Sequence, residues 1–289
     1  MAIAHALTLE DIVAKTHDLP ALSAAASAVM READSPTGSV EGMARALGSD
    51  PSLAAQVLRL ANSAFYGMPR RVGSIPQAVQ LLGTRAVRNL ALVSATFPWL
   101  ARPVSGYALG PGQLWTHALG TAVGASLVAE RTRKANPDLA FTAGLLHDIG
   151  KVAMSVWLER KLPGLLRIAE IEGTPFDAVE RRVLGYDHTQ VGAHLGERWN
   201  LPSELIEAMR WHHQPDLAPT PDPLIDAVHV ADYLSMAMGL GIGGDGLRYD
   251  LSEESLRRLL LFPEDLVLMA DEFVDRYETQ SRAFAEVQR

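Results

Sequence analysis

The sequence predicts an all-α protein with two helical lobes, and three observations support that fold class. Apolar residues recur at helical spacing through most of the 289 residues, as at Leu53, Val57 and Leu60. No segment shows the strict alternation of apolar and polar residues that marks a half-buried strand. Proline and capping residues interrupt the apolar runs often, which predicts short helices of roughly one to five turns.

Several of the predicted helices begin at a proline. Ser49-Asp50-Pro51 supplies a capping residue and then a proline at the first helical position, where its missing N–H costs nothing. Ser74-Ile75-Pro76 and Leu201-Pro202 resemble this pattern and predict two further helix starts.

Three segments are predicted to interrupt the helices. Residues 98–112 carry three prolines and three glycines, so we expect them to end a helix and to join a lobe of residues 1–105 to a lobe of residues 106–289. Residues 215–223 carry four prolines and residues 239–246 five glycines, and both are predicted surface loops. The glycine segment lacks the Lys-Ser/Thr pair of a phosphate-binding loop, which favours a flexible loop.

Composition limits the functions open to this chain. Hydrophobic residues make up 48% and charged residues 21% of the sequence, which is typical of a folded globular protein. A net charge of −8 disfavours binding to nucleic acid. No apolar run reaches the roughly 18 residues of a membrane helix, and residues 1–11 lack the features of a secretory signal. We therefore expect a soluble, cytoplasmic protein with neither nucleic-acid nor membrane partners.

An ordered set of histidines and aspartates in the second predicted lobe is expected to hold metal. The sequence has no cysteine, so metal ligands must be histidine, carboxylate or backbone oxygen. Each of these residues alone could be an ordinary hydrogen-bonded side chain. Together they occur in order at helix positions able to face inward, and burying them is costly unless they are paired. The candidate metal ligands are His117, His147, Asp148, His188, His212, His213 and Asp232.

These residues suit two metal ions better than one. Five imidazoles and two carboxylates favour iron or manganese, with zinc as an alternative, over magnesium or calcium. Adjacent residues on a helix diverge by about 100°, so His147 and Asp148 are not expected to hold one ion by pointing the same way. The Asp148 carboxylate is instead expected to bridge two ions. The remaining positive charge would attract a phosphate-containing or nucleotide ligand.

Three further residues are assigned roles outside the set of metal ligands. Lys151 is a candidate catalytic residue that could contact a substrate phosphate, although a solvated lysine at a helix end is the commoner outcome. His229 lies one turn before Asp232 and could orient it, but an ordinary core or surface histidine is as common. Asp187 is expected to cap the helix that carries His188.

At these residues the sequence resembles a known superfamily. The motif Gly144-Leu-Leu-His-Asp-Ile-Gly-Lys151, with His117 before it and Asp232 after it, resembles the HD superfamily of metal-dependent phosphohydrolases and phosphodiesterases. The segments Asp50-Pro-Ser-Leu-Ala-Ala-Gln-Val-Leu-Arg-Leu-Ala-Asn-Ser63 and Ile75-Pro-Gln-Ala-Val-Gln-Leu-Leu-Gly83 are similar to the HDOD branch of helical bacterial signalling proteins. The resemblance implies an N-terminal helical bundle packed on an HD-domain-like helical core. It also carries the seven ligands onto the metal pattern of the HD-GYP branch.

The resemblance leaves two functions open. The HDOD signature favours a regulatory protein that acts as an output or scaffold module with protein signalling partners. The full ligand set and Lys151 favour an active metal-dependent phosphodiesterase or phosphohydrolase that acts on a nucleotide or cyclic dinucleotide. Gln214-Pro215 stands where HD-GYP enzymes continue with Glu and Gly-Tyr-Pro, so recognition of cyclic di-GMP is not expected. Gln113 stands where some relatives carry Glu, so we expect no third ion.

Overall fold

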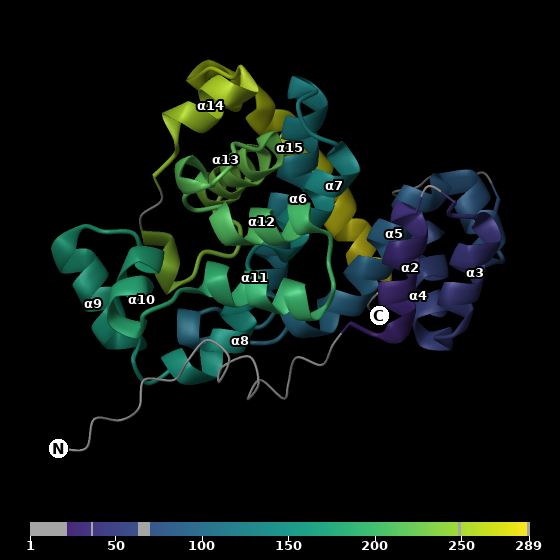
Figure 1. The fold of residues 1–289 in the computed structure, drawn as a ribbon, viewed down its shortest axis with the longest axis horizontal. Coiled ribbons are helices and arrows are strands. Elements are labelled where there is room, and N and C mark those ends of the chain that lie inside the picture. Colours follow the sequence, from purple (N-terminus) through teal and green to yellow (C-terminus); the bar gives the residue numbers. More distant parts are fainter. Residues whose placement is uncertain (1–21, 36, 63–69, 248–249, 288–289) are drawn as a thin grey trace. The chain divides into compact units, whose positions relative to one another are not determined.

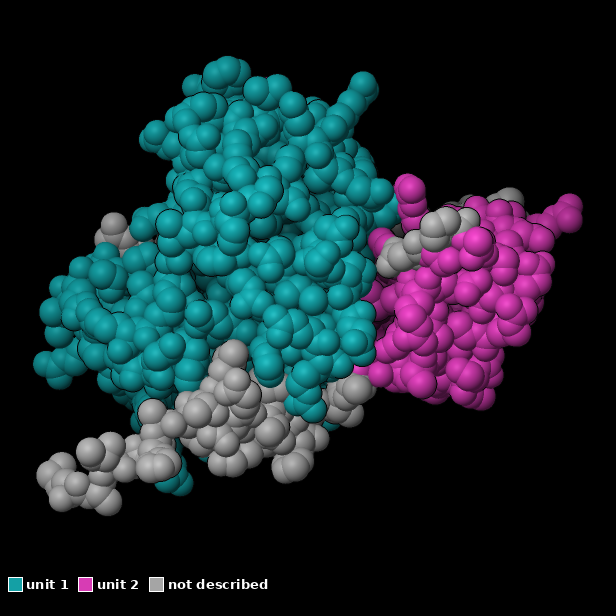
Figure 2. Space-filling view, in the orientation of Figure 1, with its two compact units in different colours: residues 1–20, 99–267 teal, residues 21–98, 268–289 magenta. Residues whose placement is uncertain are grey.

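The computed structural model describes residues 22–35, 37–62, 70–247 and 250–287. Over these residues the fold is all-helical, as predicted: they contain no β-strand, only an isolated bridge between Val104 and Leu109. The chain forms two compact units, one with Trp99–Val267 and the other with Ala21–Pro98 and Leu268–Arg289 (Figure 2). The division predicted from the sequence, into lobes of residues 1–105 and 106–289, stays a prediction. Residues 1–11 lie outside the described part.

The unit with the N-terminal helices shows how local sequence sets each helix start. Asp50 caps its helix by accepting from the N–H groups of Ser52 and Leu53, and Pro51 occupies the first turn, as predicted. Helix α3 (Val40–Gly48) packs against α2 (Ala24–Asp34) and α4 (Pro51–Ala61). The core that they share includes Val29 and Leu47. The helices are α2 (Ala24–Asp34), α3 (Val40–Gly48), α4 (Pro51–Ala61) and α5 (Ile75–Leu100) (Figure 1).

Helix α5 differs from the sequence prediction in two places. Gly83 has φ +85° and ψ 162°, a backbone conformation that interrupts the helix and that glycine tolerates. The helix then continues through Pro98 to Leu100, whereas residues 98–112 are predicted to end it at once. Pro98 removes only the helical hydrogen bond to the carbonyl of Ser94, and the last turn of a long helix can lose that bond.

The other unit is built around α6 (Gln113–Thr132), which packs against α7 and α13. From Leu114 to Ala129 only Thr116 and Ser126 are not buried, and a helix that is buried on all sides lies at the centre of its unit. No helix in the described ranges is long and apolar enough to span a bilayer. The surrounding α-helices are α7 (Pro137–Leu146), α8 (Ile149–Leu158), α9 (Leu162–Glu172), α10 (Phe176–Leu184), α11 (His188–Arg198), α12 (Ser203–Trp211), α13 (Pro223–Ala237), α14 (Glu253–Leu259) and the start of α15 (Pro263–Val287), with short 3-10 turns at Ser105–Tyr107, Pro215–Leu217 and Gly244–Leu247.

Two glycines of the His-Asp motif let four helices approach closely. A Cβ atom on Gly144 would lie 2.6 Å from the carbonyl oxygen of Thr121, so α7 rests directly on the backbone of α6. A Cβ atom on Gly150 would lie 1.9 Å from the carbonyl oxygen of His188, so α8 rests directly on α11. These contacts hold the α7–α8 junction between α6 and α11, where the candidate ligands lie.

Candidate metal centre

The structure brings all seven predicted ligands together within one unit. They come from α6, the α7–α8 junction, the start of α11, the end of α12 and the middle of α13. All except His213 are buried. Their donor atoms fall into overlapping sets whose members lie within 4.8 Å of one another. The sets are Asp148 with His188, His212 and His213; His117 with His147 and Asp148; and His147 with His212 and Asp232.

The prediction that His147 and Asp148 point apart is wrong. His147 follows the last residue of α7, and Asp148, with φ −101° and ψ 10°, precedes the first residue of α8. The two residues therefore do not share one continuous helix, and Nε2 of His147 lies 3.4 Å from Oδ2 of Asp148. Both side chains can face the same point.

The Asp148 carboxylate lies between two sets of imidazoles. Its Oδ2 atom is 3.4 Å from Nε2 of His117, whereas its Oδ1 atom is 3.4 Å from Nε2 of His188 and 3.7 Å from Nε2 of His212. Two ligand atoms that each bind one ion at about 2.1 Å are about 3.0–3.4 Å apart. The spacing therefore suits one ion on each side of the carboxylate.

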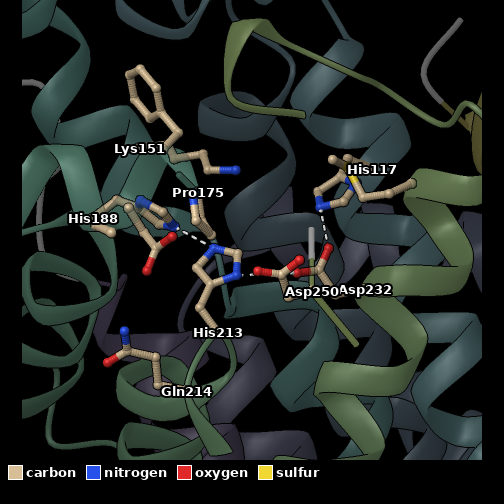
Figure 3. A pocket seen from close by; sticks show the side chains of 12 residues that line it. His117, Lys151, Pro175, His188, His213, Gln214, Asp232 and Asp250 are labelled. Carbon is tan, nitrogen blue, oxygen red and sulfur yellow. Dashed lines mark hydrogen bonds and ion pairs between the residues drawn. The ribbon is translucent and has the colours of Figure 1, made fainter. Parts of the chain in front are cut away.

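Asp232 and His213 complete the two sets. Oδ1 of Asp232 lies 3.0 Å from Nε2 of His117, and Nε2 of His213 lies 3.0 Å from Nε2 of His188. In Figure 3 His117 and His213 both point toward Asp232. We define the first group as His117, His147, Asp232 and Oδ2 of Asp148, and the second group as His188, His212, His213 and Oδ1 of Asp148.

Three buried atoms at the centre of these groups lack hydrogen-bond partners among the described residues. They are Oδ1 of Asp148, Nε2 of His212 and Oδ2 of Asp148, the last of which forms an ion pair with Nζ of Lys151 at 2.6 Å. Leaving a buried polar atom unpaired costs about 1–3 kcal/mol. Oδ1 of Asp148 and Nε2 of His212 belong to the second group, and a cation bound there would satisfy both of these atoms at once.

Hydrogen bonds on the far side of the rings orient three of the histidines. Each donates from Nδ1 to a backbone carbonyl, which can only accept, so the proton sits on Nδ1 and Nε2 faces the cluster. The pairs are His117 with Leu240 (3.2 Å), His147 with Gly144 (2.6 Å) and His212 with Met209 (2.9 Å).

A buried glutamate orients the fourth histidine. Nδ1 of His188 donates to Oε2 of Glu180 over 2.7 Å, and the hydroxyl of Tyr107 donates to the other oxygen of Glu180. Burial raises the pKa of Glu180, although the neighbouring His188 opposes that rise. Glu180 could not be identified from the sequence, because only the packing of α10 against α11 brings it to His188 and no local motif marks it.

The start of α11 is fixed by Asp187, as predicted. Asp187 accepts from the N–H of Gln190, and the side chain of Gln190 accepts from the N–H of Asp187, which completes a capping box. Arg181 also pairs with Asp187 and lies 2.6 Å from Asp177. This network fixes the first residue of the helix, which is His188.

Two segments outside the predicted set support the cluster. His229 donates from Nδ1 to the carbonyl of His212 over 2.7 Å and accepts at Nε2 from the N–H of Ser252. It thus supports the backbone of a candidate ligand and not Asp232. Gly241, with φ +61°, packs so closely that a Cβ atom would lie 2.1 Å from the carbonyl of Gln113. Part of the glycine segment is therefore packed on α6 beside His117.

Burial and neighbouring charges give the histidines different pKa values. Burial, together with charge on His147, lowers the pKa of His212 to about 3. Burial and charge on His212 also hold the pKa of His213 well below its usual range. Burial lowers the pKa of His188 too, but the adjacent Glu180 carboxylate outweighs it and raises that pKa to about 9. His212 and His213 are thus neutral near pH 7, the form that binds metal.

A cavity of about 290 Å³ opens onto the cluster (Figure 3). Lys151 lines it but is only 5% exposed, and its Nζ lies 2.6 Å from Oδ2 of Asp148, so it is not a solvated cap. A cation in the first turn of a helix opposes the helix dipole, and the Asp148 carboxylate offsets that cost. Other residues at the cavity are His117, Phe176, His188, His213, Gln214, Asp232 and Asp250.

Replacing Glu180 with glutamine is expected to weaken metal binding at the second group by about 10-fold, because partners of ligand histidines typically contribute about 10–100-fold in affinity. The first group should be unaffected. Tyr107→Phe is the control, since it removes a hydrogen bond to Glu180 without altering the contact with His188, and it should have a smaller effect. Calorimetric titration with Mn²⁺ measures both binding steps. Equal weakening of both steps would contradict a specific role for Glu180.

The all-helical fold and the buried histidine-aspartate cluster define the class of HD-type helical domains. The chain belongs to the HDOD family, because the model of the HDOD domain matches residues 19–215. The all-α fold and the family resemblance predicted from the sequence are therefore confirmed. The use of the seven residues as metal ligands stays a prediction.

Several solved structures and related sequences are similar to this chain. An HDOD domain protein from Geobacter sulfurreducens is similar with a TM-score of 0.71 and 26% identity, over 98% of this chain and 97% of that chain. A candidate signal transduction protein from Marinobacter aquaeolei has a TM-score of 0.74 and 26% identity, over 94% of this chain and 60% of that chain. A Treponema pallidum protein is 29% identical over 76% of this chain, and the matched region covers 43% of the length of that protein. Ribonuclease Y of Thermus thermophilus is 34% identical over 42% of this chain and 15% of its own length.

Proposed function

We propose that this chain is a bacterial signal-transduction protein of the HDOD family whose HD-type site holds two divalent metal ions, iron or manganese, with zinc as an alternative. The observation that carries the proposal is the position of Asp148, whose two carboxylate oxygens face different groups of ligand atoms at 3.4–3.7 Å. The first group would hold one ion and the second group the other. The orienting hydrogen bonds on four of the histidines support this assignment.

The cavity favours a phosphate-containing or nucleotide ligand. When bound, two such ions supply Lewis-acid polarisation of a phosphate oxygen. Lys151 lies at the cavity wall beside Asp148, where its ammonium could pair with a phosphate. In a regulatory protein, binding of this ligand would control the interaction of the chain with its protein signalling partners. A cytoplasmic location and the absence of a nucleic-acid partner stay predictions from the sequence.

The alternative function is that of an active metal-dependent phosphodiesterase or phosphohydrolase. The buried position of Lys151 favours it, because a buried ammonium next to the ligand groups is placed for a substrate and not for solvent. The similarity to ribonuclease Y covers 42% of the chain and makes RNA one substrate to test. Gln214 lies at the cavity where the sequence departs from the HD-GYP pattern, so turnover of cyclic di-GMP should be poor.

Metal analysis followed by a substrate screen tests both functions. We expect close to two ions per chain after reconstitution with Fe²⁺ or Mn²⁺. We also expect slow hydrolysis of bis(p-nitrophenyl) phosphate and little turnover of cyclic di-GMP or a short RNA. Absence of metal after reconstitution would overturn the metal site itself. Cleavage of cyclic di-GMP or RNA at about 1 per second or faster, a rate typical of enzymes, would replace the regulatory function with the enzymatic one.

A further inference from the structure

A second cavity lies in the unit that contains the N-terminal helices and shares no residue with the metal centre. Its volume is about 200 Å³, below the roughly 300–1,000 Å³ of sites for drug-sized ligands, so it suits a small molecule. Three helices of that unit contribute its walls. The residues are Gln56, Arg59 and Leu60 from α4, Val93, Ser94, Phe97 and Pro98 from α5, and Phe284 from α15.

A buried hydroxyl without a partner lines this cavity. Ser94 is only 7% exposed, and its Oγ atom has no hydrogen-bond partner among the described residues. Helical serine and threonine can satisfy such a hydroxyl by donating to the carbonyl four residues earlier. Thr96 does so in the same helix, since its hydroxyl donates to the carbonyl of Leu92 over 2.9 Å. The hydroxyl of Ser94 therefore remains available to a ligand.

The helix backbone beside Ser94 also lacks one hydrogen bond. Pro98 lies four residues later in α5 and has no N–H to donate to the carbonyl of Ser94. This turn therefore lacks one helical hydrogen bond, and it can move to admit a ligand at lower cost than an intact turn.

The polar groups of the cavity are donors that match a carboxylate. Gln56 and Arg59 are three residues apart on α4 and so share a face of the helix. Arg59 is exposed and forms no ion pair with any described residue, so its guanidinium is free to bind a carboxylate through two hydrogen bonds. With a single cation and mostly apolar walls, the cavity favours one negative charge over the two of a phosphate.

We propose that this cavity binds a small monocarboxylate with an apolar body, such as a medium-chain fatty acid or an aromatic acid. The carboxylate accepts hydrogen bonds from Arg59 and from the hydroxyl of Ser94. The apolar body packs against Leu60, Val93 and Phe97. The ligand would give the HDOD unit a small-molecule input that is separate from the metal centre.

Calorimetry and thermal unfolding of the full chain with octanoate and benzoate test this site. We expect one carboxylate to bind per chain in a saturable manner. The Kd should be about 1 mM or lower, an affinity that ligands of this small size can reach. Arg59→Gln should weaken binding by at least about 10-fold, the loss of a charge-assisted pair. Arg45→Gln is the control, because Arg45 is an exposed arginine in the last turn of α3 that does not line the cavity, and it should change nothing.

Ser94→Ala separates ligand binding from packing. It should weaken octanoate binding several-fold while raising the Tm of the ligand-free chain by about 2–4 °C, since it removes an unpaired buried hydroxyl. No saturable binding of either carboxylate, or equal binding by the Arg59→Gln variant, would overturn the proposal. Equal affinity for octanol would show an apolar cavity without carboxylate recognition. Tighter binding of inorganic phosphate, lost in Arg59→Gln, would also overturn it.

Discussion

The Asp148→Ala variant is expected to lose both metal ions, so that metal content falls from about two per chain to near zero. The carboxylate belongs to both groups, and its removal takes one ligand from each ion together with the negative charge that partly neutralises them. It also leaves Lys151 buried beside the site without this carboxylate, and that positive charge repels a cation. Elemental analysis after reconstitution with Mn²⁺ measures the loss.

Single histidine variants should behave differently from Asp148→Ala. His117→Ala affects only the first group and His188→Ala only the second, so each should lose mainly one ion. His194→Ala is the control, because His194 lies on the same helix as His188 but pairs with Glu197 at 3.2 Å, outside the cluster. Circular dichroism must show that every variant keeps its helices. If His117→Ala and His188→Ala lose both ions as completely as Asp148→Ala, Asp148 has no special bridging role.

Local sequence patterns predicted the helices because the signals that start and end a helix are local. Asp50 and Pro51 begin α4 through contacts within three residues, and Asp187 caps α11 in the same way. The candidate ligands could also be selected from the sequence, because several histidines and aspartates occur together on the inner faces of apolar helices, where burial is costly unless they are paired. The burial of His117 at 3% exposure agrees with its helical spacing.

Two of the orienting partners could not be predicted, because they reach their histidines only through packing between separate elements of the fold. Glu180 reaches His188 only where α10 packs against α11, and Leu240 offers its carbonyl to His117 from a segment 123 residues away. The sequence alone predicts His147 and Asp148 to be neighbours on one helix. A break between α7 and α8 turns both side chains toward the cluster, and no residue in the motif signals that break without the structure.

The motif glycines explain why those two side chains end in the right place. Gly144 and Gly150 flank His147-Asp148, and each allows direct contact between helix backbones. A larger residue at either position would move the junction relative to α6 or α11. The glycines thus set the distance from Asp148 to His188 although neither glycine can bind a metal.

The Gly150→Ala variant is therefore expected to lose about 3 kcal/mol in the free energy of unfolding, the upper part of the range for overpacked cores. Its new Cβ atom would lie 1.9 Å from the carbonyl oxygen of His188 and 2.7 Å from the amide nitrogen of Gly192, and both are backbone atoms that cannot rotate away. Gly164→Ala in α9 is the matched control, because its Cβ atom would meet nothing within 4 Å. That change should stabilise the chain by about 0.5 kcal/mol through the lower entropy of its unfolded state.

Urea unfolding of both glycine variants in the presence of a chelator measures these differences without the contribution of bound metal. Manganese titration of Gly150→Ala should also show weaker binding at the second group, because α8 can accept the methyl group only by moving away from His188. Binding at the first group should change less, since His117 and Asp232 lie on α6 and α13. A Gly150→Ala variant as stable as the Gly164→Ala variant would show that α8 and α11 do not need this close contact.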